Sequence, residues 1–200
     1  MRSEDANLIE RCLRGDEKGF EELLNKYKSR VFSICQRMVR NSADAEDLAQ
    51  EVFVRTFSVL DRYDSSYPFS RWLYRITSNL CIDFLRSNRK GGIISLDQSI
   101  ESGDGEMPRQ FPSGVIKPDR EAEIKEMMAA LEEAIGRLPE YYRIIVILRH
   151  QGQLSYEEIS DDLGIPLGTV KARIHRARKM IKDFFKERGL LEEAEGIGSD

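Results

Sequence analysis

The 200-residue sequence has few of the residues from which most catalytic and metal sites are built. It contains two histidines and three cysteines: His150, His175, Cys12, Cys35 and Cys81. They are too few and too scattered for a zinc cluster or a catalytic triad, and the sequence has no glycine-rich phosphate loop. The cysteines occupy apolar positions of helical patterns, which predicts small buried side chains. We therefore expect no catalytic residue, no metal and no cofactor, and a protein that is not an enzyme.

Long hydrophobic runs are also missing. No stretch of about eighteen apolar residues occurs, so no membrane-spanning helix is expected. The first twenty residues, MRSEDANLIERCLRGDEKGF, lack the apolar segment of a secretory signal, which predicts a cytoplasmic protein. An apolar content of 40% with a third of the residues charged is ordinary for a soluble protein with one or two modest cores.

The chain has no overall positive charge: its formal net charge is −4, which argues against non-specific nucleic-acid binding. The lysines and arginines are nevertheless concentrated in two segments. Residues 166–188 contain eight basic and two acidic side chains, a local charge of +6. Residues 71–90 contain five basic side chains and one acid, a local charge of +4. Two separated basic segments on an acidic chain predict two contacts with DNA.

Apolar residues recur with the 3.6-residue period of helices over most of the chain. Helices are expected at residues 8–13, 17–39, 41–60, 70–88, 119–137, from 139, from 155, and at 167–185. Taken alone, the run IIVIL at 144–148 is compatible with a buried strand, but the flanking helices and Pro139 favour a buried helix. The predicted fold class is all-α: two small helical domains joined by a flexible linker, the second containing a helix-turn-helix.

The domains are expected at residues 1–90 and 119–188. Residues 91–118 contain five glycines, three prolines and several acids without a sustained period, which predicts a flexible linker. The acidic residues 189–200 form a short tail.

The stretch 41–60, NSADAEDLAQEVFVRTFSVL, has the apolar stripe of a packed helix, and Ser42 is expected to cap it. On the opposite face, Asp47, Gln50 and Glu51 lie at spacings i, i+3 and i+4. Such a patch is either a solvated surface or a binding site, and the period alone favours the solvated surface.

The segment FSRWLYRITSNLCIDFLRSNRK combines basic charge with aromatic rings, and Tyr63 and Tyr67 precede it. Charge follows a nucleic-acid backbone, and rings replace base stacking at about 1–3 kcal/mol each. Trp72, however, shares a helical stripe with Ile76 and Leu80. That spacing favours a core position for Trp72 over a stacking platform.

The segment LSYEEISDDLGIPLGTVKARIHRARKMIKDFF has the pattern of a helix-turn-helix. Ser155 and Glu158 are spaced as a capping box, and Gly164 ends the first helix. A purely structural helical hairpin is the alternative, and the charge of +6 argues against it. The outward face of the second helix carries a possible reading set: Lys171, Ala172, His175 and Arg176. Thr169 and the helix-start amides are placed for phosphate.

Three of these stretches resemble bacterial RNA polymerase sigma factors of the extracytoplasmic-function group (group IV). DAEDLAQEVFVRTF is similar to the helix that docks on core RNA polymerase, with family contact positions at Asp47, Gln50, Glu51 and Phe53. SRWLYRITSNLCIDFLR resembles the segment that opens the −10 promoter element. There Asn79 matches the position, at the end of a recognition loop, that captures a flipped-out base. GTVKARIHRAR resembles the helix that reads the −35 element.

The resemblance implies three sets of contacts. Core polymerase is bound through the patch on 41–60. Unpaired −10 DNA is contacted by Arg71, Trp72, Arg75, Asn79 and Arg86. Duplex −35 DNA is contacted by Thr169, Lys171, Ala172, His175, Arg176 and Arg178. The His175 side chain is either a base contact or a surface residue. Arg178 lies farther along the helix, where it is expected to touch the DNA backbone or solvent.

The resemblance also implies an anti-sigma factor as a partner, no direct membrane insertion, and a linker that threads close to the polymerase cleft. Two other functions are weighed against it. A helix-turn-helix regulator acting without polymerase accounts for 154–188 but leaves 41–90 unexplained. A sigma-like mimic that only sequesters a regulator need not keep a basic recognition helix, and no phosphate-receiver repeat is present.

Overall fold

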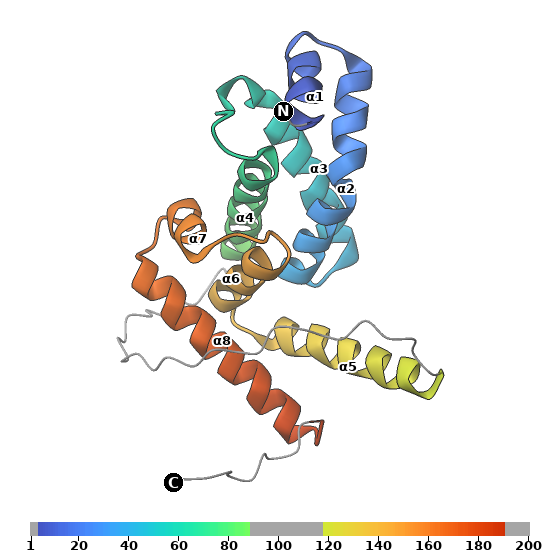
Figure 1. The fold of residues 1–200 in the computed structure, drawn as a ribbon, viewed down its shortest axis with the longest axis vertical. Helices are drawn as coiled ribbons and strands as arrows, with labels where there is room; N and C mark the ends of the chain where they lie inside the picture. Colours follow the sequence, from blue (N-terminus) through green and yellow to red (C-terminus); the bar gives the residue numbers. More distant parts are fainter. Residues whose placement is uncertain (1–3, 89–117, 191–200) are drawn as a thin grey trace.

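The computed structural model describes residues 4–88 and 118–190, and within these ranges it contains helices and no strands (Figure 1). The helices are α1 Glu4–Leu13, α2 Glu17–Val39, α3 Ser42–Ser58, the 3₁₀ turn η1 Leu60–Arg62, α4 Phe69–Asn88, α5 Pro118–Arg137, α6 Glu140–His150, α7 Tyr156–Leu163 and α8 Leu167–Glu187. The predicted all-α class is confirmed. The predicted linker lies outside the described residues, except that Pro118 already begins α5, and so do the last ten residues of the tail.

The start of α3 differs from the prediction by one residue. Asn41, not Ser42, caps the helix: its side-chain oxygen accepts hydrogen bonds from the amides of Ala43 at 2.9 Å and Asp44 at 3.2 Å. A capping residue needs extended backbone, and Asn41 has φ −130° and ψ 130°, whereas Ser42 is already helical. Arg40 directly before it is left-handed, with φ 61°, so α2 and α3 meet at a sharp corner.

Helices α1 to α4 pack around α2, which contacts the other three. The predicted burial of Cys12, Cys35 and Cys81 is confirmed, since each is at most 3% exposed. Helix α6 carries the IIVIL run, and the prediction of a helix there is confirmed. It is apolar nearly all round because it contacts α2, α4, α7 and α8 on its different sides.

One hydrophobic cluster runs through both halves of the molecule. It includes Leu23, Val31 and Leu73 from the first half together with Ile145 and Leu148 of α6. In Figure 1, α6 lies between α4 and α8, beneath the bundle of α1 to α4. Two smaller clusters pack α8 against α5 and α6. None of the described helices has the length and hydropathy needed to cross a membrane.

Polar contacts also join the two halves. Arg143 of α6, only 8% exposed, donates to the carbonyl oxygens of Met38 at 2.7 Å, Gly136 at 2.8 Å and Leu138 at 2.8 Å. These carbonyls stand at or just past the C-terminal ends of α2 and α5, where helices leave acceptors unsatisfied. A cation there is also favoured by both helix dipoles.

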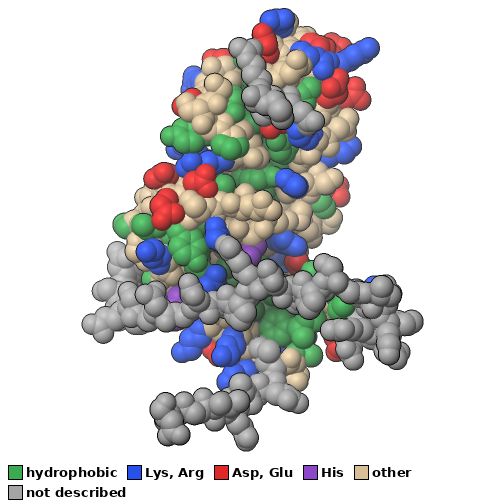
Figure 2. Space-filling model, in the orientation of Figure 1, with side chains coloured by type: hydrophobic (Ala, Val, Ile, Leu, Met, Phe, Trp, Pro, Cys, Tyr) green, Lys and Arg blue, Asp and Glu red, His purple; other side chains and the backbone are tan. Residues whose placement is uncertain are grey.

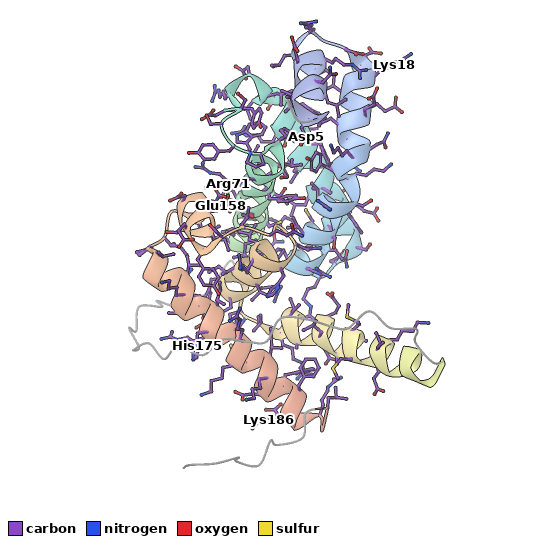
Figure 3. The ribbon with its side chains drawn as sticks, in the orientation of Figure 1. Asp5, Lys18, Arg71, Glu158, His175 and Lys186 are labelled. Carbon is purple, nitrogen blue, oxygen red and sulfur yellow. The ribbon has the colours of Figure 1, made fainter. Side chains whose placement is uncertain are left out.

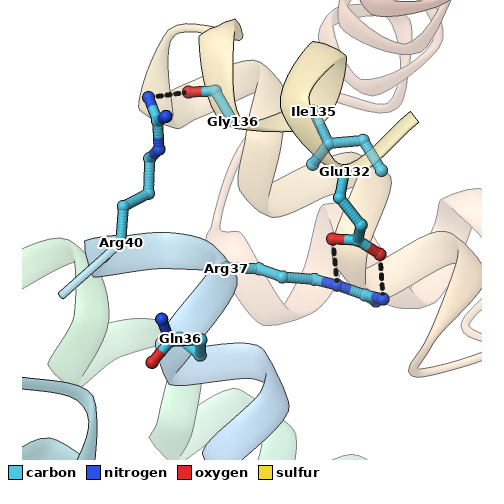
Figure 4. Close-up of a pocket in the computed structure, with 6 residues that line it drawn as sticks. All are labelled: Gln36, Arg37, Arg40, Glu132, Ile135 and Gly136. Atoms are coloured by element: carbon cyan, nitrogen blue, oxygen red, sulfur yellow. Dashed lines mark hydrogen bonds and ion pairs between the residues drawn. The ribbon is translucent and has the colours of Figure 1, made fainter. Parts of the chain in front are cut away.

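A shallow pocket of about 230 Å³ lies beside this junction, between α2 and α5 (Figure 4). Arg37 forms a bidentate ion pair with Glu132 across it. Arg40 donates to the carbonyl of Gly136 at 2.9 Å. A β-carbon at Gly136 would come within 3.0 Å of the Arg40 guanidinium, so glycine permits this approach.

Candidate nucleic-acid and protein interfaces

The acidic patch on α3 is fully on the surface. Asp47, Gln50 and Glu51 are all exposed, while Ala45, Leu48 and Val52 on the opposite side are buried. The helix period thus separates a packing face from a polar face, as expected from the sequence. Two carboxylates and an amide within one turn can accept hydrogen bonds and pair with basic side chains of a partner.

Phe53 does not belong to this exposed patch. It is 7% exposed, and its ring lies 6.0 Å from that of Phe57 within the core. Position 53 belongs to the apolar stripe of α3, so the Phe53 side chain points inward and packs in the core. Val54, by contrast, is 70% exposed and is the large apolar side chain available beside the acids. Its spacing, three residues after Glu51 and seven after Asp47, puts Val54 on the same face of the helix as the acids.

The basic face of α4 is formed by residues four to seven positions apart. Arg75, Asn79 and Arg86 are exposed, and Arg71 lies one turn before Arg75. From first to last these positions span about 22 Å of helix. Asp83, 3.9 Å from Arg86, is also exposed, and such a surface pair contributes little. The face can follow a nucleic-acid backbone over several nucleotides.

Arg71 is the exception on this face because it is already occupied. Its side chain is 12% exposed and approaches three carboxylates of α7 (Figure 3). The shortest distances are 3.3 Å to Asp162, 3.5 Å to Glu158 and 3.6 Å to Asp161. Burial raises the pKa of Asp162, and Arg71 acts in the opposite direction. The guanidinium also lies 4.9 Å from the ring centre of Tyr67.

Asn79 does not end a loop. It lies in the middle of α4, because the apolar period continues unbroken through the segment. The nearby loop spans residues 63–68, ahead of the helix. The Asn79 side chain is exposed, and its contact with a flipped-out base stays a prediction.

Trp72 is half-buried and packs on the core, with its ring 5.4 Å from that of Tyr63 and 5.8 Å from that of Phe69. This placement favours the interpretation of Trp72 as a packing residue. The exposed ring at this end of α4 is instead Tyr67, at 53%. Proteins that bind single-stranded nucleic acids stack the bases on exposed aromatic side chains that lie beside basic residues.

The helix-turn-helix geometry forms as predicted. Ser155 accepts from the amide of Glu158 at 3.1 Å, and Glu158 accepts from the amide of Ser155 at 2.8 Å, which completes the capping box. Gly164 ends α7 in the left-handed conformation, with φ 63°. The Ser160 hydroxyl donates to the carbonyl of Ile165 at 2.6 Å and fixes the turn.

This turn makes a stability prediction. Gly164→Ala is expected to lower the free energy of unfolding by about 1–2 kcal/mol, because a side chain is strained at this φ although nothing lies within 4 Å. Gly168→Ala is the matched control, since Gly168 is equally open but lies in the first turn of α8 without a positive φ. Thermal unfolding of both variants compares them, and an equal effect would mean that the turn tolerates a side chain.

The proposed reading positions lie on the outer side of α8. Lys171 and His175 are exposed, whereas Thr169, Ala172, Arg176 and Arg178 are half-buried. Their exposed edge is continued by Lys179 and Lys182. Figure 2 shows basic side chains gathered over the lower part of α8 and acidic ones over α7. Helix α8 begins at Leu167, and Pro166 before it offers no side-chain cap, which leaves room for an anion at the first turn.

Two neighbours modify this face. Arg173 does not point outward: its guanidinium lies 5.2 Å from the ring centre of Tyr141. Burial lowers the pKa of His150, and the positive charges of Arg178 and Arg149 lower it further. The half-buried Arg178 therefore lies near enough to α6 for its charge to act on His150, and its contact with DNA stays a prediction.

Comparison with known proteins matches two separate segments of the chain to family models. Residues 23–91 match the family model Sigma-70 region 2, and residues 128–181 match Sigma-70, region 4. The chain is 35% identical over 175 residues to the ECF RNA polymerase sigma factor SigW of Bacillus subtilis, covering 87% of this chain and 92% of the relative. It is 34% identical over 182 residues to the ECF RNA polymerase sigma-E factor of Escherichia coli, covering 88% and 92%.

Solved structures share the fold. CnrH, solved in complex with the cytosolic domain of CnrY, superposes with a TM-score of 0.61 at 22% identity over 92% of this chain and 97% of that one. RpoE of Bartonella quintana, solved with the anti-sigma factor NepR, gives 0.58 at 20% identity over 84% and 98%. With two family regions in order and full-length relatives above 30% identity, the chain belongs to the extracytoplasmic-function RNA polymerase sigma factors.

Proposed function

We propose that the chain binds core RNA polymerase through the exposed α3 patch, contacts the unpaired −10 element with α4, and reads the duplex −35 element with α8. The observation that carries the proposal is the separation of these surfaces. One acidic face and two basic faces occupy three different helices, in the order in which region 2 and region 4 follow one another. The chain itself catalyses no reaction in this scheme, and the polymerase carries out the chemistry.

The partners follow from the same assignment. The relatives of known structure include one in complex with an anti-sigma factor, NepR, which supports an anti-sigma factor as a regulator of this chain as well. Such a regulator would act by covering the polymerase or promoter surfaces. Binding to core polymerase and promoter DNA places the active protein in the cytoplasm.

Core-dependent transcription tests the function directly. The purified chain and bacterial core polymerase are incubated with a pool of promoter fragments, with core alone as the control. Specific transcripts that share an upstream sequence are expected. Tight binding to core without any transcript would instead favour a mimic. Binding to duplex DNA without binding to core would favour a helix-turn-helix regulator that acts alone.

The −35 assignment makes its own prediction. Replacing Lys171 and His175 with alanine should weaken binding to the matched −35 duplex by about 30-fold or more, because two base contacts of about 1–3 kcal/mol each together contribute at least ~2 kcal/mol. Binding to an unrelated duplex should change far less. Alanine at Lys179 and Lys182 is the control, since lysines farther along α8 should weaken both duplexes alike. Fluorescence anisotropy measures all four combinations, and equal losses for both pairs would assign Lys171 and His175 to the backbone.

A further inference from the structure

A stacked pair of side chains joins α6 to the flank of α8, and the three proposed surfaces leave it without a role. The guanidinium of Arg173 lies 5.2 Å from the ring centre of Tyr141, the second residue of α6. Both side chains are half-buried. The pair therefore links the helix that precedes the helix-turn-helix to the helix that carries the proposed reading positions.

Packing of α6 on α8 does not account for an arginine at this place. The interior of the contact is a separate apolar cluster, which is made by Leu138, Tyr142, Val146 and Ala177. Tyr141 packs at the edge of this cluster, and an apolar side chain at position 173 could cover its ring as well. Among the residues that the structure describes, Arg173 also has no ion pair. Its positive charge is thus available to an anion from outside the chain.

The stacked geometry leaves the donors of Arg173 free to act. A cation–π contact uses the face of the guanidinium, whereas its five N–H groups point outward in the plane of the group. The oxygens of a phosphate can accept two of these hydrogen bonds while the ring contact persists. The ring also limits the conformations of a long side chain, so less conformational entropy is lost when an anion binds.

The charges around the pair favour an anion. Burial raises the pKa of Tyr141, whereas the positive charges of Arg173 and Arg176 act in the opposite direction. The hydroxyl therefore stays neutral at physiological pH and does not repel a phosphate. Since both guanidinium groups affect the same hydroxyl, both lie close to it. Even with the carboxylate of Glu140, which precedes Tyr141, two positive charges stand against one negative.

The position of Arg173 on α8 matches the edge of a groove. Arg176, one of the proposed reading positions, follows it by three residues, so about 60° separate the two around the helix. The major groove is about as wide as a helix with its side chains, ~12 Å. Side chains on the flank of a reading helix therefore meet the phosphates that line the groove, and the flank with Arg173 faces α6.

We propose that Tyr141 and Arg173 form a phosphate-binding pair, in which the ring of Tyr141 holds the guanidinium of Arg173 against one backbone phosphate of the −35 duplex. The pair rests on the proposed function, because it needs α8 in the major groove. It carries no sequence information, since every base pair presents the same phosphate. Tyr141 acts through Arg173 as a positioning residue, and the contact fixes how α6 and α8 sit on the duplex.

Binding of the full-length protein to duplex DNA tests the pair. Fluorescence anisotropy compares a matched −35 duplex, taken from a promoter isolated in the transcription assay, with an unrelated duplex between about 50 and 200 mM salt. Arg173→Gln is expected to weaken binding to both duplexes alike, by about tenfold, as for one charge-assisted hydrogen bond. The slope of log affinity against log salt should become shallower by about 0.9, the loss of one phosphate contact.

The ring is tested by two substitutions at position 141. Tyr141→Leu leaves the guanidinium unsupported and should weaken binding to both duplexes by about threefold, whereas Tyr141→Phe keeps the ring and should bind as the parent does. In the Arg173→Gln background, Tyr141→Leu should have no further effect, because the ring acts through the arginine. Arg173→Gln removes no side chain from the apolar cluster, so it remains a test even where Tyr141→Leu unfolds the chain.

Arg188→Gln is the matched control. Arg188 also lies over a ring, 4.7 Å from the centre of that of Phe184, and directly follows α8. It is already paired with Glu133 at 2.7 Å, and it lies ~22 Å farther along the helix than Arg173. This variant removes the same charge and should keep the parent's affinity and salt slope.

The pair is overturned if Arg173→Gln keeps the parent's salt slope, or if Tyr141→Phe binds as weakly as Tyr141→Leu. It is equally overturned if Tyr141→Leu weakens binding by the same factor with and without Arg173, since the ring then supports only the fold. Failure of the proposed function gives a different result. A chain that shows the expected losses on the unrelated duplex but supports no transcription keeps the pair, whereas one that transcribes with an unchanged slope in Arg173→Gln loses only the pair.

Discussion

Alanine at Asp47 and Glu51 is expected to reduce core-dependent transcription by at least tenfold while the melting temperature stays within about 2 °C of the parent. Both side chains are exposed on α3, and surface substitutions away from packing features usually change stability by less than ~0.5 kcal/mol. Alanine is also the best helix former. At the centre of an interface, in contrast, charged anchors typically contribute ~2 kcal/mol or more each.

The control for this prediction lies on the neighbouring helix. Glu17 and Glu21 are exposed acids on α2 with the same four-residue spacing, so their replacement by alanine removes the same charge elsewhere on the same half of the molecule. That variant should transcribe as the parent does. If the α3 variant also transcribes within twofold of the parent, the patch is a solvated face and polymerase binds elsewhere.

Arg143→Met is expected to cause the largest loss of stability, about 3 kcal/mol or more. The side chain is buried and donates to the carbonyl oxygens of Met38, Gly136 and Leu138. An apolar chain of similar length leaves the carbonyls of Met38 and Leu138 without this donor, whereas that of Gly136 keeps the donor supplied by Arg40. Each buried acceptor left without a donor costs ~1–3 kcal/mol. For a chain of this size, the melting temperature should fall by about 6–12 °C, which calorimetry measures.

Arg149→Met gives the comparison within the same helix. Arg149 is half-buried, donates once, to the carbonyl of Leu154 at 2.7 Å, and lies 5.1 Å from the ring centre of Tyr156. Its loss should cost about 1–2 kcal/mol. Equal losses at both positions would mean that the carbonyls facing Arg143 find other donors, and that the junction of α2, α5 and α6 does not depend on it.

Local rules predicted the helices well because their signals are local. The apolar period of α2 and the capping box at Ser155 are each determined within one or two turns, and the structure has both. The cap of α3 moved by one residue since Asn41 and Ser42 are both good caps, and only the backbone geometry of the corner at Arg40 decides between them.

Long-range pairings were beyond sequence reasoning. Arg71 and Asp162 are 91 positions apart, and nothing near either residue specifies the other. The predicted −10 face treated Arg71 as free for DNA because a basic helix read alone has no neighbours. Arg143 gave no signal for the same reason: in sequence it is a polar position within an apolar helix, whereas its three acceptors come from other segments.

The placement of aromatic side chains was partly predictable. The stripe through Trp72 and Ile76 correctly favoured packing for Trp72, since the ring lies on the core. For Phe53, the family resemblance suggested a contact with polymerase, yet the apolar stripe of α3 turns it inward. At Phe53, the helical period predicted the burial that the structure shows, whereas the family resemblance predicted a contact with a partner.

The hydrophobic cluster shared by the two halves has a calorimetric consequence. Ile145 and Leu148 of α6 are buried in the same cluster as the core of α1 to α4, so neither half has a closed interior of its own in this arrangement. Heating should therefore melt the chain in a single cooperative transition, with a van't Hoff enthalpy equal to the calorimetric one. A variant in which the two halves separate should melt in two steps. Its heat capacity should exceed that of the parent, because the separation exposes the apolar surface of α6 to water.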